Sequence, residues 1–393
     1  MRVLIAPDCF AGTLSAGQAA EAIAEGWRRA ASHDRLDLLP LSDGGPGFCD
    51  VLTRALGGQS VAVTVSDPLG RPVPAALLVA EPGGGRTVYV ETAQACGLHL
   101  LAEAERDPSQ TSSYGVGQLL EAALAEAPSR LVVGLGGSGV NDGGAGMLAA
   151  LGVGTAQALA GGGARLADLA DDGLQGLVAV RERFRGVELV VAADVDLTLL
   201  GFHGASASAA ADRGATPEGA QQLERALGRL TEVAQRTLPP ARELLTGAAR
   251  RLDREPGAGA AGGLGYGLLL LGGHVVSGVD AVLHAVGVDD RLGAADLLVT
   301  GEAVLDWQSL RGTVVAGIAR AALAAAVPTV VLAGQAHVGR RETMALGISG
   351  TYAVAERPDR VPVFEADPAG TLAARAARVA TTWSPRRDGT SYP

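Results

Sequence analysis

Short apolar runs alternate along this chain with longer alanine-rich stretches of helical periodicity. The runs predict strands at residues 3–6, 36–39, 131–134, 189–192, 297–300, 329–332 and 351–354. Ser15 and Gln18 have the spacing of a capping box, which predicts the start of the first helix. Further helices are expected at 48–56, 111–126, 217–237 and 309–326. This alternation is typical of an α/β protein with a mainly parallel sheet.

Residues 61–90 have a different pattern. Three short apolar runs are joined there by Asp67-Pro68-Leu69-Gly70 and by Gly83-Gly84-Gly85, with no helical stretch between them. Turn residues at such short intervals predict an antiparallel meander rather than parallel strands joined by helices. With 393 residues the chain also exceeds the size at which a single core stops growing. We therefore expect a second domain to begin in this region.

Composition and charge narrow the function classes. Hydrophobic residues make up 48% of the chain and charged residues 19%, which is enough to form a large core and excludes general disorder. The net charge is −10 and the sequence has no strong basic patch, so we expect no nucleic-acid partner.

The chain contains no lysine, because all 32 of its basic residues are arginine. This absence excludes a Walker A loop, the phosphate-binding lysine of the protein-kinase fold, and Schiff-base chemistry. The three cysteines are widely spaced, which favours a reducing compartment, and we expect a cytoplasmic location. The histidines lack the spacing of metal ligands. Residues 256–279 carry no charge, but their high glycine content predicts a buried loop and helix rather than a membrane span.

Carboxylates and glycine loops follow several predicted strands. They occur at Asp8, at 43–45, at 136–144, at Asp194 and Asp196, and at Glu302 with Asp306. In open α/β sheets, ligands bind at the carboxyl ends of the strands. Glycine loops can hold phosphate oxygens, and carboxylates can hold Mg²⁺ or accept the proton of an acceptor hydroxyl. This combination suits phosphoryl transfer, although each aspartate taken alone also fits a helix cap or a turn.

Two other motifs are incomplete. Residues 134–139 fit the glycine pattern of a dinucleotide fold, but the acidic ribose partner is missing about 20 residues further on. Ser138 lacks the closing glycine of a serine-hydrolase elbow, because Val140 occupies that position.

Taken together, the loops resemble those of the bacterial glycerate kinases, and the resemblance extends over nearly the whole chain. The matching stretches are IAPDCF (5–10), DGG (43–45), VETAQACGL (90–98), TSSYGVG (111–117), GLGGS (134–138) with NDGGAG (141–146), ADVD (193–196), PGAGAAGGLG (256–265), and TGE (300–302) with LD (305–306) and QS (308–309).

This resemblance implies a fold and an activity. We expect a Rossmann-like α/β domain from residues 1–63 and 287–383, an inserted α/β domain at 64–286, and a disordered tail at 384–393. The implied activity is phosphorylation of D-glycerate at its 2-hydroxyl with ATP and Mg²⁺. The implied partner is this small hydroxy acid, with no membrane partner, and a homo-oligomer is left open.

The resemblance also implies roles for particular residues. Asp194 is the expected base, with Asp43 as the second candidate and Asn141 as a further catalytic residue. Asp142, Glu302 and Asp306 are the expected Mg²⁺ or water-orienting residues. The expected phosphate-binding residues are Gly136, Gly137 and Ser138, together with a second glycine loop that contains Gly257, Gly259, Gly262 and Gly263. The nucleotide and acceptor sides of this arrangement could be exchanged.

The chain departs from the family pattern at positions that usually carry charge or lack a side chain. These positions are Ala11, Pro46, Val304, Trp307 and Thr313, where the family usually has Lys, Glu, Arg, Gly and Lys. Three cations are thus absent from a site that must bind anions. Arginines elsewhere could replace them, namely Arg71, Arg213, Arg311 or Arg340. The alternatives are a kinase for a different hydroxy compound and a catalytically impaired binding protein.

Overall fold

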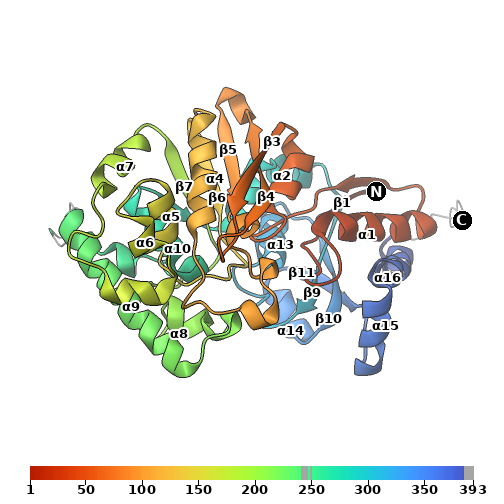
Figure 1. The fold of residues 1–393 in the computed structure, drawn as a ribbon. Coiled ribbons are helices and arrows are strands. Elements are labelled where there is room, and N and C mark those ends of the chain that lie inside the picture. The colour runs from red at the N-terminus through yellow and green to blue at the C-terminus, as the bar shows by residue number, and fades with distance from the viewer. Residues whose placement is uncertain (240–246, 248–249, 385–393) are drawn as a thin grey trace, which may run out of the picture. The chain divides into compact units, whose positions relative to one another are not determined.

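The computed structural model describes residues 1–239, 247 and 250–384, which form two compact units (Figure 1). Unit 1 comprises Met1–Ser42, Asp50–Ala55 and the residues from Val279 onward, and unit 2 comprises Asp43–Cys49 and Leu56–Gly278. Each unit contains its own β-sheet. The expected α/β class is therefore confirmed, with one domain built from both ends of the chain and a second inserted into it.

The sheet of unit 1 has five parallel strands in the order β11-β10-β9-β1-β2. Their bounds are β1 (Arg2–Ile5), β2 (Arg35–Leu38), β9 (Leu297–Leu305), β10 (Thr329–Ala336) and β11 (Ile348–Ala353). Both faces of the central strands are covered. Val330 and Leu332 lie in one hydrophobic cluster, whereas Val331 and Ala333, which point the other way, lie in another. This burial on both faces explains the continuous apolar runs in the sequence.

Helices α1 (Ala16–Ala30) and α16 (Pro368–Trp383) pack side by side on one face of this sheet (Figure 1). Their close approach depends on Gly26, where a Cβ atom would lie 1.9 Å from the Ala373 carbonyl oxygen. On the other face, α13 (Val314–Ala324) contributes Val315 and Ala319 to the second cluster. The remaining helices assigned wholly or partly to unit 1 are α2 (Phe48–Leu56), α11 (Gly278–Ala285), α12 (Val288–Gly293), α13 (Val314–Ala324), α14 (Arg340–Ala345) and α15 (Val361–Ala366).

The sheet of unit 2 has six strands in sequence order, β3 to β8. Their bounds are β3 (Gln59–Ser66), β4 (Pro72–Ala80), β5 (Thr87–Glu91), β6 (Arg130–Gly134), β7 (Glu188–Ala192) and β8 (His274–Val276). The first three strands pair antiparallel, which confirms the predicted meander, and β5 to β8 pair parallel. The parallel strands direct their carboxyl ends to one edge. The loops that follow β6 and β7 there carry six predicted site residues, namely Gly136, Gly137, Ser138, Asn141, Asp142 and Asp194.

The helices of unit 2 enclose a core formed mainly by valine, leucine and alanine. They are α3 (Ala93–Cys96), α4 (Tyr114–Ala125), α5 (Ala145–Ala150), α6 (Ala156–Leu159), α7 (Leu177–Arg183), α8 (Ala205–Ala209), α9 (Pro217–Thr237) and α10 (Ala260–Leu270). Helix α9 begins and ends at the predicted residues. Its first turn is fixed by Thr216, whose side chain accepts a hydrogen bond from the Gly219 N–H, and by Pro217.

Several predicted bounds differ from those observed. Helix α13 begins at Val314 instead of 309, and α4 at Tyr114 instead of 111. Residues 257–271 form mostly buried turns and α10, as expected, whereas 272–277 are more exposed and contain β8. Strand β3 contains the predicted domain boundary at residue 63, so unit 2 already includes 56–63, and unit 1 resumes at Val279. The predicted tail begins at Ser384, whose N–H donates to the Ala380 carbonyl at the end of α16. Residues 385–393 of this tail lie outside the described residues.

Within the described ranges, no helix combines the length and the apolar character needed to cross a membrane.

Candidate active site

Two glycine segments of unit 2 lie directly against each other at the carboxyl end of β6. A Cβ atom on Gly134 would lie 2.5 Å from the Gly44 carbonyl oxygen, and one on Gly136 would lie 2.6 Å from the Gly45 Cα. Neither position has room for a side chain, so glycine is required for this backbone contact. The segment that follows β2 is thereby held over the loop that follows β6.

The two predicted base candidates, Asp43 and Asp194, lie close to the same residue. A Cβ atom on Gly278 would lie 1.8 Å from the Asp43 carbonyl oxygen and 2.9 Å from Asp194 Oδ2. Ser277 Oγ donates a hydrogen bond of 2.8 Å to Asp194 Oδ1 and orients this carboxylate, while Asp43 Oδ1 accepts from the Gly45 N–H at 2.9 Å. Both aspartates remain partly exposed. The fold therefore brings the Asp43 backbone and the Asp194 carboxylate to one glycine, although the two residues lie 151 positions apart in the chain (194 − 43).

The predicted phosphate-binding loop has accessible backbone N–H groups. Gly137 is exposed and Gly136 partly so, and their N–H groups donate to no acceptor in the described part of the chain. Gly137 adopts a φ of +61°, a left-handed conformation that favours glycine. The loop is fixed on either side of these residues, since the Gly137 carbonyl accepts from the Leu98 N–H and the Gly139 N–H donates to the Cys96 carbonyl. This is a suitable geometry for holding anionic oxygens.

A buried carboxylate, Glu91 at the end of β5, holds the neighbouring segment in place. Its two oxygens accept from the N–H groups of Gly47 and Cys49, at 3.0 and 3.1 Å. Burial and the Glu91 charge raise the pKa of the Cys49 thiol, which makes it a poor nucleophile. Glu91 therefore positions the start of α2 and, with it, the glycines that contact the β6 loop.

Asp142, a predicted magnesium ligand, is fully buried and already hydrogen-bonded. Its carboxylate accepts from the Ser113 N–H and hydroxyl at 2.8 and 2.9 Å, and from the N–H groups of Gly144 and Gly146 at 3.0 and 3.2 Å. Burial raises the pKa of Asp142, and these four donors oppose that shift. The arrangement favours a structural role, in which Asp142 joins the starts of α4 and α5.

The neighbouring Asn141 is also fully buried. Its Nδ2 donates to Ser206 Oγ at 2.9 Å, and its Oδ1 has no partner in the described ranges. This places Asn141 beneath the loop rather than at its accessible surface.

The second predicted glycine loop, which leads into α10, consists of packing glycines. A Cβ atom on Gly259 would lie 2.2 Å from the Thr198 carbonyl oxygen, and one on Gly262 would lie 1.9 Å from the Val140 carbonyl oxygen. A Cβ atom on Gly257 would meet Val275, and one on Gly263 would meet Gly143 and Leu199. The N–H groups of Gly259 and Gly263 donate to backbone carbonyls. This geometry favours backbone packing over anion binding for Gly257, Gly259, Gly262 and Gly263.

Unit 1 carries the remaining predicted carboxylates near the carboxyl end of β9. Glu302 Oε1 is buried without a hydrogen-bond partner in the described ranges. Burial raises the pKa of Glu302 to about 7, with a smaller contribution from the nearby charge of Asp306. Asp306 Oδ1 accepts from the N–H groups of Gln308 and Ser309, and the Ser309 hydroxyl accepts in turn from the Asp306 N–H. The result is a tight turn beside a carboxyl group that is poised to titrate near neutral pH.

The positions that depart from the family pattern lie on the surface or at helix and loop ends. Ala11 and Pro46 are exposed, and the Pro46 ring faces Gly137. Val304 is 38% exposed and Trp307 is 65% exposed. Thr313 is the N-cap of α13, where its hydroxyl accepts from the Ala316 N–H. None of the five forms part of the hydrophobic core, so they can change without disturbing the fold.

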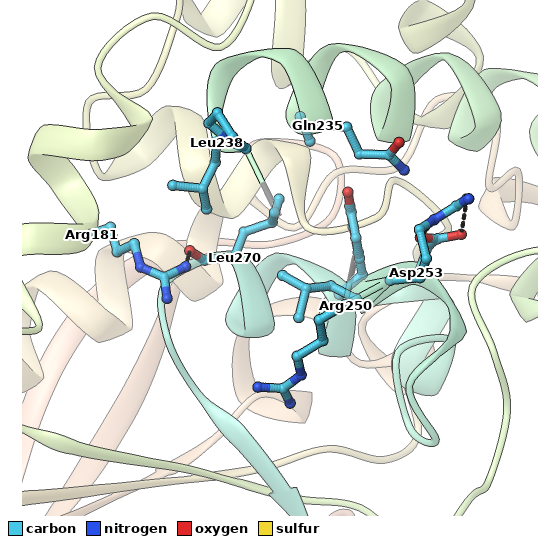
Figure 2. A pocket seen from close by; sticks show the side chains of 11 residues that line it. Arg181, Gln235, Leu238, Arg250, Asp253 and Leu270 are labelled. Carbon is cyan, nitrogen blue, oxygen red and sulfur yellow. Dashed lines mark hydrogen bonds and ion pairs between the residues drawn. The ribbon is translucent and has the colours of Figure 1, made fainter. Parts of the chain in front are cut away.

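A separate cavity of about 220 Å³ lies elsewhere in unit 2 (Figure 2). Arg181 donates to the Leu270 carbonyl on one side of it, and on the other side Arg251 forms a two-point ion pair with Asp253. None of the predicted site residues lines this cavity.

In the described part of the chain, no three His, Cys, Asp or Glu side chains lie close enough together to hold a metal ion by themselves. A magnesium ion bound chiefly through nucleotide phosphates needs only one or two protein carboxylates.

Two residues that shape the site were not assigned a role from the sequence. Ser277 follows β8, a strand of only three residues that gives too short an apolar run to be recognised. Glu91 belongs to a stretch that matches the family, and a carboxylate at the end of a fully buried strand is the signal that could have identified it.

Comparison with known proteins agrees with this geometry. A sequence profile of the glycerate kinase family matches residues 3–384. The chain is 38% identical over 371 residues to glycerate kinase of Bacillus subtilis, covering 93% of each protein. It is 34% identical over 341 residues to glycerate 2-kinase of Escherichia coli, covering 85% of each. A crystal structure from Salmonella typhimurium LT2, of a protein assigned as glycerate kinase 2, superposes with a TM-score of 0.73 at 32% identity, covering 97% of this chain and 98% of that one.

Proposed function

The chain belongs to the glycerate kinase family, and we propose that it transfers the γ-phosphoryl group of ATP to the 2-hydroxyl of D-glycerate, giving 2-phosphoglycerate and ADP. The observation that carries this proposal is that the Asp194 carboxylate and the Asp43 backbone meet at Gly278, while the Asp43 segment lies against a loop with accessible N–H groups. A carboxylate and a phosphate-binding loop at one sheet edge are the parts that phosphoryl transfer requires.

Asp194 is our candidate for the base. As the 2-hydroxyl oxygen forms its bond to the γ-phosphorus, the bond from that phosphorus to the β-γ bridging oxygen breaks, and the hydroxyl proton passes to Asp194. The Ser277 hydrogen bond to Oδ1 supports this role, because it holds the carboxylate in one orientation. Asp43 remains the second candidate, since it lies at the same glycine.

The N–H groups of Gly136 and Gly137 are our candidates for binding phosphate oxygens. Their exposure and lack of backbone partners support this role, and the fixed positions of Leu98 and Gly139 keep them oriented without a ligand. Preorganised donors of this kind stabilise developing negative charge better than mobile ones.

Glu302 and Asp306 fit a magnesium site, because Glu302 has a buried oxygen without a partner and Asp306 places a second carboxylate nearby. In phosphoryl transfer, Mg²⁺ would supply positive charge that offsets the charge of the nucleotide phosphates. Since the pKa of Glu302 is about 7, the group must lose its proton to serve as a ligand.

The activity is tested by coupled ADP release from the purified protein with ATP, Mg²⁺ and D-glycerate, with other small hydroxy acids and sugars in parallel. We expect glycerate-dependent turnover on the order of 1–100 s⁻¹. Turnover with another acceptor only would indicate a changed specificity. Absence of turnover, combined with a melting temperature that ATP still raises, would indicate a binding protein.

The base assignment predicts that Asp194→Asn lowers kcat by roughly 10²–10⁴-fold, because the amide cannot accept the proton. The measurement is steady-state ADP release, with circular dichroism to confirm folding. Ser277→Ala is the matched variant, and we expect it to lower kcat by a smaller factor, since the carboxylate remains but is less well oriented. Full turnover by Asp194→Asn would rule this residue out as the base.

A further inference from the structure

A buried arginine in unit 2, Arg213, has an unpaired guanidinium nitrogen. Its side chain is 8% exposed. Nε donates to the Ser138 carbonyl at 2.9 Å, and one terminal nitrogen, Nη2, lies 3.3 Å from Ser138 Oγ. The other terminal nitrogen, Nη1, is buried and has no acceptor among the described residues. Two of the three nitrogens thus fix the guanidinium on the glycine loop, and the third is buried without a partner.

Arg213 also forms no ion pair of its own. Across the described ranges, no carboxylate makes a salt bridge with it, although the charge of the neighbouring Asp212 acts on it and partly opposes the effect of burial on its pKa. Arg71, another candidate for replacing the missing cations, is paired with both Asp67 and Glu105. The remaining two candidates, Arg311 and Arg340, are exposed on unit 1. A buried cation that forms no ion pair is costly, so Arg213 is the one of the four whose environment favours a negatively charged ligand.

The position of Arg213 links this positive charge to the proposed chemistry. Ser138, which Arg213 contacts, follows directly on Gly136 and Gly137, and those two glycines lie against Gly45 and Pro46. One short loop therefore connects the guanidinium to the segment that contains Asp43.

We propose that Arg213, with Ser138, binds the carboxylate of the hydroxy-acid acceptor. In a 2-hydroxy acid the carboxylate is bonded to the carbon that carries the reacting hydroxyl, so an anion site and a base must lie at neighbouring places. The planar guanidinium fork matches the geometry of a carboxylate, and burial strengthens the attraction. This inference rests on the proposed function and adds to it the group that selects acids over neutral alcohols.

The test compares two enzymes with two acceptors. Arg213→Met keeps the length and apolar stem of the side chain but removes its charge, and D-glyceramide is the neutral amide of D-glycerate. We expect Arg213→Met to lower kcat/KM for D-glycerate roughly 30- to 1,000-fold. The KM for ATP and the turnover of D-glyceramide should change by less than about threefold. A merely structural role would instead lower the turnover of both acceptors equally, and that result would overturn the proposal.

A matched control and a conservative variant sharpen the result. Arg181→Met also removes a partly buried arginine of unit 2 that donates to a backbone carbonyl, but Arg181 lines the separate cavity of Figure 2. We expect it to leave both acceptors unaffected. Arg213→Lys should raise the KM for D-glycerate about tenfold and leave that for ATP unchanged, since the charge remains without the fork. If Arg213→Met does not fold, Arg213→Lys alone tests the proposal. A rise in its KM for ATP, with an unchanged KM for D-glycerate, would overturn the proposal.

A binding measurement separates this inference from the proposed activity. If the wild-type chain does not turn over D-glycerate, the proposed activity fails, and the anion site is read from thermal unfolding with D-glycerate or with inorganic sulfate. A carboxylate site would be supported if D-glycerate, but not sulfate, stabilises the wild type and if D-glycerate no longer stabilises Arg213→Lys. Equal stabilisation of both proteins, or of neither, would overturn it. Stabilisation by sulfate alone would assign the arginine to a phosphate and also overturn the proposal.

Discussion

Asp142 of unit 2 and Glu302 of unit 1 have the same setting in sequence, yet the structure gives them opposite environments. In the sequence each follows a predicted strand and lies next to glycine, but in the structure β9 extends to Leu305 and contains Glu302. Asp142 accepts four hydrogen bonds and joins the starts of two helices. Glu302 has a buried oxygen without a partner, and burial raises its pKa to about 7.

The difference shows that burial alone does not identify a functional carboxylate. A buried carboxylate whose oxygens are all engaged stabilises the fold, because its donors would otherwise be unpaired. One with an unpartnered oxygen costs free energy in the absence of a ligand, which is a common property of binding and catalytic groups. The number of hydrogen-bond partners separates the two cases.

The largest expected effect on stability comes from Asp142→Asn. The variant loses the charge and turns an NH₂ group toward N–H donors, so we expect the free energy of unfolding to fall by about 3 to 5 kcal/mol. Urea unfolding followed by circular dichroism measures this. Asp43→Asn is the matched control, because this carboxylate is partly exposed and accepts one hydrogen bond from Gly45; it should cost less than about 1 kcal/mol. Similar losses in the two variants would show that the four hydrogen bonds of Asp142 stabilise the fold no more than the single one of Asp43.

Glu302→Gln should change the pH dependence of stability. The pKa of Glu302 is about 7 in the folded chain against a model-peptide value of 4.5, so the folded state retains the proton over this range. The wild type should therefore lose stability as pH rises from about 4.5 to 7, by on the order of 3 kcal/mol for 2.5 pKa units. The glutamine variant lacks this dependence, and its stability relative to wild type should increase over the same range. Parallel pH profiles of the two unfolding free energies would contradict the assignment.

The smallest effect is expected at Thr313, which caps α13 next to the Glu302 region. Thr313→Ala removes the acceptor for the Ala316 N–H and the hydrogen bond to the Ser309 carbonyl, and should cost about 1 kcal/mol. Thr313→Ser keeps the hydroxyl and should remain near wild type in the same urea experiment. A loss well above that value in Thr313→Ala would mean that this residue supports more of unit 1 than one helix end.

Local signals predicted much of the fold. The Ser15–Gln18 capping box is present, and the Pro217–Thr237 helix begins with a capping threonine followed by proline. Each of these signals acts over a few residues, and the sequence therefore contains all the information needed to recognise it. The antiparallel meander is defined in the same way by its turns.

Features that depend on distant partners could not be predicted. Strand β8 has three residues, and its pairing with β7 makes it a strand. Helix α13 starts later than expected because Ser309 binds back to Asp306 and Val304 instead of capping the helix. Sequence patterns placed carboxylates at strand ends but could not distinguish Asp142 from Glu302, since their hydrogen-bond partners come from other parts of the fold.

The pairing of β1 with β9 has a consequence for the time course of synthesis. Val3 pairs with Leu297, so the first strand of unit 1 cannot join the centre of its sheet until nearly 300 residues have been translated. At about 5–20 residues per second, this delay amounts to roughly 15 to 60 s. The six strands of unit 2, from Gln59 to Val276, all emerge within that interval. We therefore expect the inserted unit to complete its sheet on the ribosome first. During this interval β1 and α1 keep their apolar faces exposed to solvent, and we expect a chaperone to bind them.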